Sequence, residues 1–135
     1  MENNMKGFVE DIEDLTEENG DFRRVLYTGK HLQLVLMSLA PGEEIGEEVH
    51  KEGDQFFRIE EGDGEVLIDG KRTKITSGDA FVVPAGARHN VINTDDEPLK
   101  LYTLYSPPHH RDGFIATTKA DAEASKERFD GNTTE

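Results

Sequence analysis

The strongest constraint in this sequence is a pair of short stretches in which glycines and prolines are interspersed with side chains that can bind a metal. The first stretch spans residues 42–62 and the second spans residues 78–93, with fifteen residues between them. In the first stretch Glu48 and His50 lie two residues apart, so on an extended strand both side chains point to the same face. The two stretches are therefore spaced like the two halves of one site.

Four side chains form the candidate metal site, and they are Glu48, His50, Gln55 and His89. We expect Gln55 and His89 to meet the other two from neighbouring strands. Nitrogen and oxygen ligands that converge inside a β-barrel suit a divalent transition metal. The expected cofactor is therefore Fe, Mn, Ni, Co or Zn.

The two stretches resemble the two motifs of the cupin superfamily, usually written G-x5-H-x-H-x(3,4)-E-x6-G and G-x5-P-x-G-x2-H-x3-N. The second motif is matched at each fixed position, by Gly78, Pro84, Gly86, His89 and Asn93. The first is matched in spacing, but Glu48 stands where the first histidine is usual and Gln55 where the glutamate is usual. The resemblance implies an all-β fold, the cupin double-stranded β-helix or jelly-roll barrel, that binds a metal.

The two departures from the motif leave alternatives for the ligand set. Glu48 together with two histidines would complete the facial triad of non-haem iron sites, and the alternative is a surface glutamate in an acid-rich loop. Gln55 is either a neutral ligand or a group that only orients Glu48 or a bound water. Glu52 and Asp54 lie nearby, but their register relative to His50 fits the motif less well.

Short apolar runs separated by turn residues continue on both sides of the motifs, a pattern typical of an all-β sandwich or barrel. The expected strands span residues 22–28, 32–40, 55–61, 65–69, 71–76, 80–84, 89–93 and 99–106. We divide the chain into an acidic N-terminal extension (1–21), a cupin barrel (22–116) and a C-terminal helix and tail (117–135).

Both ends are expected to carry a little helix. Residues 9–15 can form one or two helical turns, and residues 117–129 are rich in the helix formers Ala, Lys and Glu. The last five residues are expected to be frayed.

Composition excludes several classes of protein. A chain of 135 residues is one domain, and the absence of cysteine excludes disulfides and thiolate ligands. A net charge of −14 argues against binding nucleic acid or an anionic membrane surface. The N-terminus lacks the pattern of a secretory signal and no apolar run is long enough to span a bilayer, so the expected location is the cytoplasm.

A homodimer is expected, because apolar residues occur on both faces of the 32–40 strand. One face would line the barrel, and the other, with part of 22–28, could pack on a second subunit.

The remaining histidines and aromatics receive weaker assignments. His109 and His110 follow a Ser-Pro-Pro turn and are expected on the surface, where one of them could touch a substrate at the barrel mouth. No role is assigned to His31. The strand aromatics are expected in the core or an interface rather than against a substrate, and they are Phe56, Phe57, Tyr102 and Tyr105.

The chemistry is less constrained than the fold, because cupins resemble one another while catalysing different reactions. The chain is similar to small single-domain bacterial cupins that are described as resembling mannose-6-phosphate isomerases. The favoured interpretation is a metalloenzyme acting on a small polar molecule, either isomerase-like or dioxygenase-like. The alternatives are a non-catalytic, metal-dependent binding module and a barrel with a vestigial site.

Overall fold

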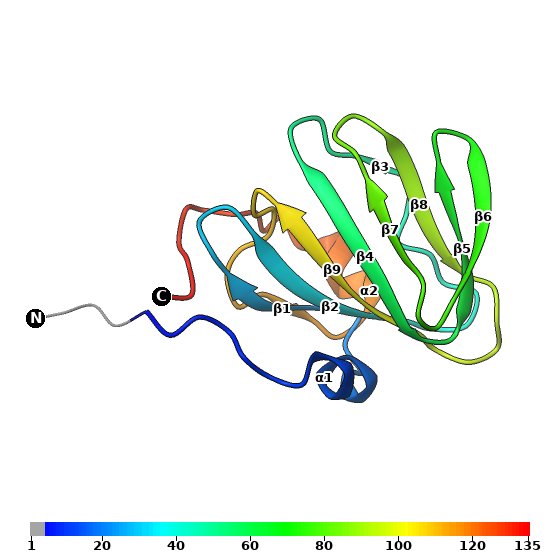
Figure 1. The fold of residues 1–135 in the computed structure, drawn as a ribbon, viewed down its shortest axis with the longest axis horizontal. Helices are drawn as coiled ribbons and strands as arrows, with labels where there is room; N and C mark the ends of the chain where they lie inside the picture. The colour runs from blue at the N-terminus through cyan, green and yellow to red at the C-terminus, as the bar shows by residue number, and fades with distance from the viewer. Residues whose placement is uncertain (1–4) are drawn as a thin grey trace, which may run out of the picture.

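Two antiparallel sheets face each other in the computed structural model, which describes residues 5–135 (Figure 1). The larger sheet, in the order β10-β1-β2-β9-β4-β7, consists of β1 (Arg23–Thr28), β2 (Gln33–Leu39), β4 (Asp54–Glu61), β7 (Ala80–Val83), β9 (Leu99–Ser106) and β10 (Ile115–Ala116). The smaller sheet, in the order β3-β8-β5-β6, consists of β3 (Glu48–Val49), β5 (Asp63–Ile68), β6 (Lys71–Thr76) and β8 (Arg88–Asn93). The predicted all-β jelly roll is confirmed.

The predicted strands are all present, and each boundary lies within two residues of its predicted position. The two-residue strands β3 and β10 were not predicted, because a segment this short carries no periodicity. β3 is nevertheless the extended segment that the spacing of Glu48 and His50 requires.

The core fills the space between the two sheets. On β2 the inward side chains are fully buried, and they are Gln33, Val35, Met37 and Leu39. Val66 and Val91 are buried on the facing sheet and belong to the same cluster. Burial of this apolar surface is the main force that holds the sheets together.

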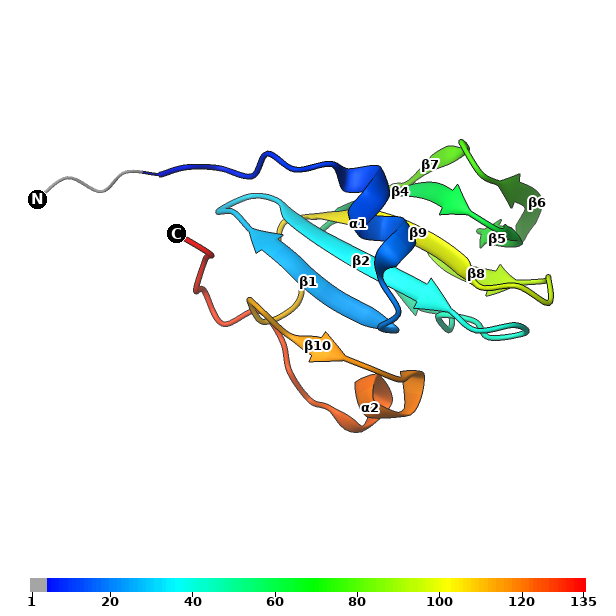
Figure 2. The same ribbon diagram turned by 90° about the horizontal axis from the view of Figure 1, so that it is seen from below.

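The outer face of the larger sheet is partly covered by helix α1 (Ile12–Glu18), which packs on β9 and β4 (Figure 2). The Lys100 ammonium donates to the Glu17 carbonyl at 2.6 Å and holds the end of the helix on the sheet. Leu36, on the outer face of β2, is also buried within one chain. The homodimer stays a prediction, and less of the outer face of the larger sheet is available for a second subunit to cover. Among residues 5–135 there is no helix of the length and apolar character needed to cross a membrane.

Two motif glycines show why the motif spacing specifies this fold. Gly62 has a φ of +98°, and a Cβ there would lie 2.5 Å from the carbonyl oxygen of Pro98, so no other residue fits. Gly86 has a φ of +89°, and its N–H donates to the carbonyl of His50 at 2.9 Å. The turn of the second motif is thereby joined to the segment of the first motif that carries the candidate ligands.

The last residue of the second motif, Asn93, stabilises the barrel rather than the site. Its amide nitrogen donates to three backbone carbonyls at 2.8–3.1 Å, those of Leu39, Ala40 and Glu97, and its oxygen accepts from the N–H of Asp95. The side chain is 1% exposed, so water cannot replace these partners.

Replacing Asn93 with alanine should therefore lower the free energy of unfolding by roughly 2–4 kcal/mol, because three backbone carbonyls would lose the donor that this buried side chain provides. Denaturant unfolding of the metal-free protein measures this change. Asn132→Ala, at an exposed position, is the control and should change the free energy by less than about 0.5 kcal/mol. Equal effects of the two substitutions would contradict the assignment.

The C-terminal segment departs from expectation in two ways. Helix α2 (Lys119–Ala124) is present but ends five residues before Phe129. The backbone N–H of Phe129 instead donates to the carbonyl of His109 at 3.0 Å, a contact that a continued helix would not allow. The expected fraying of the last residues is wrong, because Thr134 exchanges two hydrogen bonds with the backbone of Thr28.

Candidate metal centre

The four predicted ligands come from both sheets and converge between them. Glu48 lies on β3 directly opposite His89 on β8, and His50 follows β3 by one residue. Gln55 reaches the same space from β4 of the larger sheet, where it is paired with Tyr105 on β9. Each side chain points inward because of the alternation of its own strand.

The geometry of three of these residues is compatible with a shared metal ion. Ligand atoms of Glu48, His50 and His89 all lie within 4.8 Å of one another. A Glu48 carboxylate oxygen is 3.6 Å from Nε2 of His50, and the two imidazole rings are 5.3 Å apart between centroids. A metal with ligand bonds of about 2.1 Å can span such a group after small side-chain rotations.

Three buried polar atoms in this space have no hydrogen-bond partner among residues 5–135. They are Nε2 of His50, Nε2 of His89 and Oε1 of Gln55. An unsatisfied buried polar atom costs about 1–3 kcal/mol, and three of them around one point call for a common partner. Their chemistry, with the Glu48 carboxylate, is that of a divalent transition-metal site, so these residues fit the cofactor implied by the fold.

Protonation favours metal binding at both Glu48 and His89. Burial lowers the pKa of His89, which keeps its imidazole neutral near pH 7. The Ala87 carbonyl lies 3.2 Å from Nδ1 of His89 and accepts a hydrogen bond from the Nδ1–H group, so the lone pair is on Nε2, the unpartnered atom. Burial tends to raise the pKa of Glu48, but the nearby His50 imidazole and the charge of Arg23 lower it overall.

The amide of Gln55 is oriented by its neighbours. Its nitrogen donates to the Thr103 hydroxyl at 3.0 Å, and that hydroxyl donates to the carbonyl of Phe56 at 2.8 Å. This arrangement leaves the amide oxygen as the free atom. The role of Gln55 as a ligand stays a prediction, because the same orientation would also suit a group that binds a metal-bound water.

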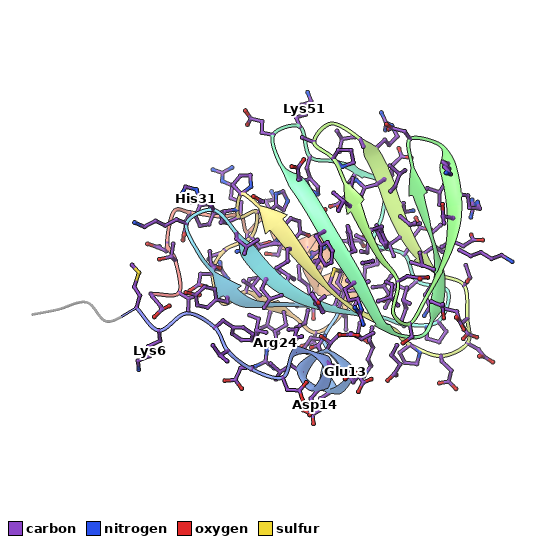
Figure 3. All side chains as sticks on the ribbon, viewed as in Figure 1. Lys6, Glu13, Asp14, Arg24, His31 and Lys51 are labelled. Atoms are coloured by element: carbon purple, nitrogen blue, oxygen red, sulfur yellow. The ribbon has the colours of Figure 1, made fainter. Side chains whose placement is uncertain are left out.

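The alternative acidic residues lie farther out. Glu52 and Asp54 line a cavity of about 330 Å³ that also borders His50 and Tyr105. Asp54 accepts from the N–H of Ala85 at 2.9 Å, so its carboxylate has a structural partner. Lys51 projects outward from the same rim (Figure 3).

His109 is closer to the centre than the sequence indicated. Its ring lies 4.6 Å from that of His50 and stacks on Tyr105 at 5.2 Å, and it lines the same cavity. Burial, with the charges of His110 and His50, lowers the pKa of His109 to about 4. The fully buried Gln33 holds this loop, because its amide oxygen accepts from the N–H groups of both histidines.

His110 is buried, and the surface position expected for it is wrong. Its Nδ1 donates to the Glu127 carboxylate at 2.7 Å, and its Nε2 lies 3.2 Å from the Tyr105 hydroxyl. Glu127 comes from the segment after α2 and also accepts from the N–H of Arg111. Tyr105 is both a core residue, 4% exposed, and part of the cavity wall. The sequence carried no signal for these contacts because they depend on where the C-terminal segment folds back.

The fold and these side chains define a small all-β barrel with a candidate metal centre between its sheets. The chain matches the Cupin domain over residues 35–105, and it belongs to the cupin family.

Known proteins support this assignment. A crystal structure of BH2720 from Bacillus halodurans is 46% identical, with a TM-score of 0.87 over 89% of this chain and 96% of that chain. The uncharacterised protein YrkC of Bacillus subtilis is 48% identical over 128 residues, which are 90% of this chain and 69% of YrkC. A predicted oxalate decarboxylase from Thermotoga maritima is 26% identical, with a TM-score of 0.56 over 58% of this chain and 68% of that chain.

Proposed function

We propose that this protein is a metal-dependent enzyme that acts on a small polar molecule held between the two sheets. The observation that carries the proposal is the convergence of the unpartnered Nε2 atoms of His50 and His89 on the Glu48 carboxylate. Gln55 would add a neutral oxygen ligand or hold a bound water.

A divalent metal bound here would act as a Lewis acid on substrate oxygens, or would support oxygen chemistry if it is iron. The protein's own part is to hold the substrate and keep water out. The cavity of about 330 Å³ at His50 has the size of a site for a small molecule.

Two side chains on the cavity wall are placed to contact the substrate. Burial raises the pKa of Tyr105 well above its ordinary value, so its phenol keeps its proton. His110 donates through Nδ1 to Glu127, which leaves Nε2 as the acceptor of the Tyr105 hydroxyl proton. The phenol oxygen can then accept a hydrogen bond from a substrate. His109 is a neutral imidazole at the cavity rim, and it is the residue available to exchange a proton with the substrate.

An enzyme is favoured over a non-catalytic binding module by two observations. Ordered proton donors and acceptors line the cavity beside the metal centre, which binding alone would not require. The similar Thermotoga maritima protein is described as a predicted oxalate decarboxylase. Isomerase-like and dioxygenase-like chemistry are both compatible with the ligand set.

Protein purified without a polyhistidine tag is expected to contain close to one divalent metal ion per chain. The reason is that the buried ligand atoms of His50, His89 and Gln55 have no hydrogen-bond partner within residues 5–135. Elemental analysis measures the content, and oxygen-uptake and sugar-isomerisation assays on the loaded protein then separate the two reaction classes. Metal-free protein that also takes up no Fe, Mn, Ni, Co or Zn would refute the proposal. Loaded protein that binds small molecules without turnover would favour the binding module.

A further inference from the structure

One cation inside the barrel has no assigned partner. Arg23 lies on β1 with its side chain pointing inward, and it is only 8% exposed. Its Nε is buried without a hydrogen-bond partner, and within residues 5–135 no hydrogen bond or ion pair to its guanidinium is found. The guanidinium carbon lies 5.3 Å from the centroid of the Phe22 ring. A buried charge without a counter-ion is costly, so this arrangement calls for an anion.

Arg23 lines a second cavity, which it shares with the candidate ligand Glu48. This cavity, of about 320 Å³, is lined by Arg23 and Glu48, and by residues of α2 at its mouth. Glu47 and Glu48 face this cavity, whereas Val49 and His50 face the first one. Two candidate ligands that lie two residues apart therefore border different cavities, with Arg23 lining the cavity of Glu48 and His109 lining the cavity of His50.

The charge of Arg23 acts on the whole site. Burial raises the pKa of Glu48 while His50, Arg23 and His89 lower it, so the guanidinium is among the charges that this carboxylate experiences. Glu48 and Glu127 are both within range of its field, yet neither contacts it. With a divalent metal held by Glu48, the centre would keep an excess of buried positive charge.

We propose that Arg23 binds the carboxylate of the substrate, so that the protein acts on a small carboxylic acid whose second oxygen group faces the metal. This inference rests on the proposed metal-dependent function and names its substrate class. The planar guanidinium presents two parallel N–H donors that match a carboxylate, and the pair would offset the excess positive charge.

The surroundings favour a carboxylate over a phosphate. The other cation on the cavity wall, Lys119, lies 4.0 Å from Glu123 and is partly neutralised by it. Glu47 and Glu123 also line the cavity, and each is paired with a cation, Arg88 and Lys119 respectively, so neither pair adds a second positive charge for a doubly charged group. A single guanidinium among these acids suits a singly charged ligand.

The test measures binding of lactate, its neutral analogue lactamide and inorganic phosphate to the metal-loaded protein by calorimetry. The wild-type protein should prefer lactate over lactamide, and Arg23→Met should weaken lactate binding about 10- to 100-fold while leaving lactamide binding nearly unchanged. Arg23→Lys should give an intermediate loss, because it keeps the charge without the paired donors. The control is Arg24→Met, the adjacent exposed arginine on the helix side of the sheet, which should bind lactate like the wild type (Figure 3).

A second measurement separates ligand binding from a structural role. Removing an unpaired buried charge should not lower the melting temperature of metal-free protein, so Arg23→Met should melt at or above the wild-type temperature. A marked fall would mean that the guanidinium serves the fold, and the inference would be wrong. If the protein binds one metal per chain but Arg23→Met leaves lactate binding unchanged, the inference about Arg23 is wrong and the proposed function still stands. The same conclusion follows if the wild-type protein prefers phosphate to lactate. Failure to bind any metal would overturn the proposed function as well.

Discussion

Replacing His89 with alanine is expected to weaken metal binding by more than about 100-fold, and replacing His50 should have an effect of the same order. Loss of a group that merely orients a metal ligand costs about 10- to 100-fold, and loss of the ligand itself should cost more. Each imidazole directs a buried Nε2 at the centre, and within residues 5–135 neither atom has another partner. Competition against a chromogenic chelator measures the affinity of each variant.

Two further variants make this experiment specific. His31→Ala removes an exposed imidazole outside the site and should leave the affinity unchanged. Gln55→Ala should cost less than either histidine variant, because a neutral amide oxygen is a weaker ligand than an imidazole nitrogen. Affinity that stays within tenfold of the wild type in His89→Ala, or that falls equally in His31→Ala, would show that the metal binds elsewhere.

The sequence predicted the barrel well because its motif positions are places where backbone geometry permits few residues. Gly62 and Gly86 require positive φ angles, and Gly86 also joins the two motifs through the carbonyl of His50. Turn residues such as these bound the strands, so the strand boundaries could be located closely, and the side chains of each strand alternate between its two faces. The same alternation placed Glu48 and His50 on one face, which brought the predicted ligands together.

The parts that sequence reasoning missed depend on contacts between distant segments. The composition of residues 117–129 favours a helix throughout, but pairing of Glu127 with His110 and of the Phe129 backbone with His109 ends it at Ala124. Arg23 could not be distinguished from Arg24 by residue type. Only the strand register shows that one points into the barrel and the other to solvent.

Metal binding is also expected to weaken as the pH falls below neutrality. A metal must displace the proton from any imidazole that is protonated, and histidine in water titrates near pH 6.5. Burial lowers the pKa of His89, so this residue becomes protonated only at a pH below that value. The pKa of Glu48 is also lowered, so its carboxylate should add a further loss only in more acidic solution. Up to two protons should be taken up by the histidines for each metal released.

Stability of the metal-free protein should fall over part of the same range for a separate reason. The pKa values of His89 and His110 are lower in the folded protein than in the unfolded chain, mainly because both side chains are buried. For each histidine, at any pH between its pKa in the folded protein and its pKa in the unfolded chain, the unfolded chain binds more protons. The free energy of unfolding therefore decreases as the pH falls below about 6.5. The stabilising effect of metal must therefore be measured as a difference between loaded and metal-free protein at each pH.

The melting temperature of metal-loaded protein should exceed that of metal-free protein by a large amount at about pH 8 and by much less at about pH 5. The reason is that a metal stabilises the native state only to the extent that it binds to that state at the given pH. Differential scanning calorimetry with and without added metal measures it directly. Titration of released metal against a chelator at the same pH values provides an independent check. An equal rise in melting temperature at both pH values would show that the bound metal does not compete with protons for imidazole nitrogens. His50 and His89 would then not be the ligands, and the unpartnered atoms between the sheets would need a different occupant.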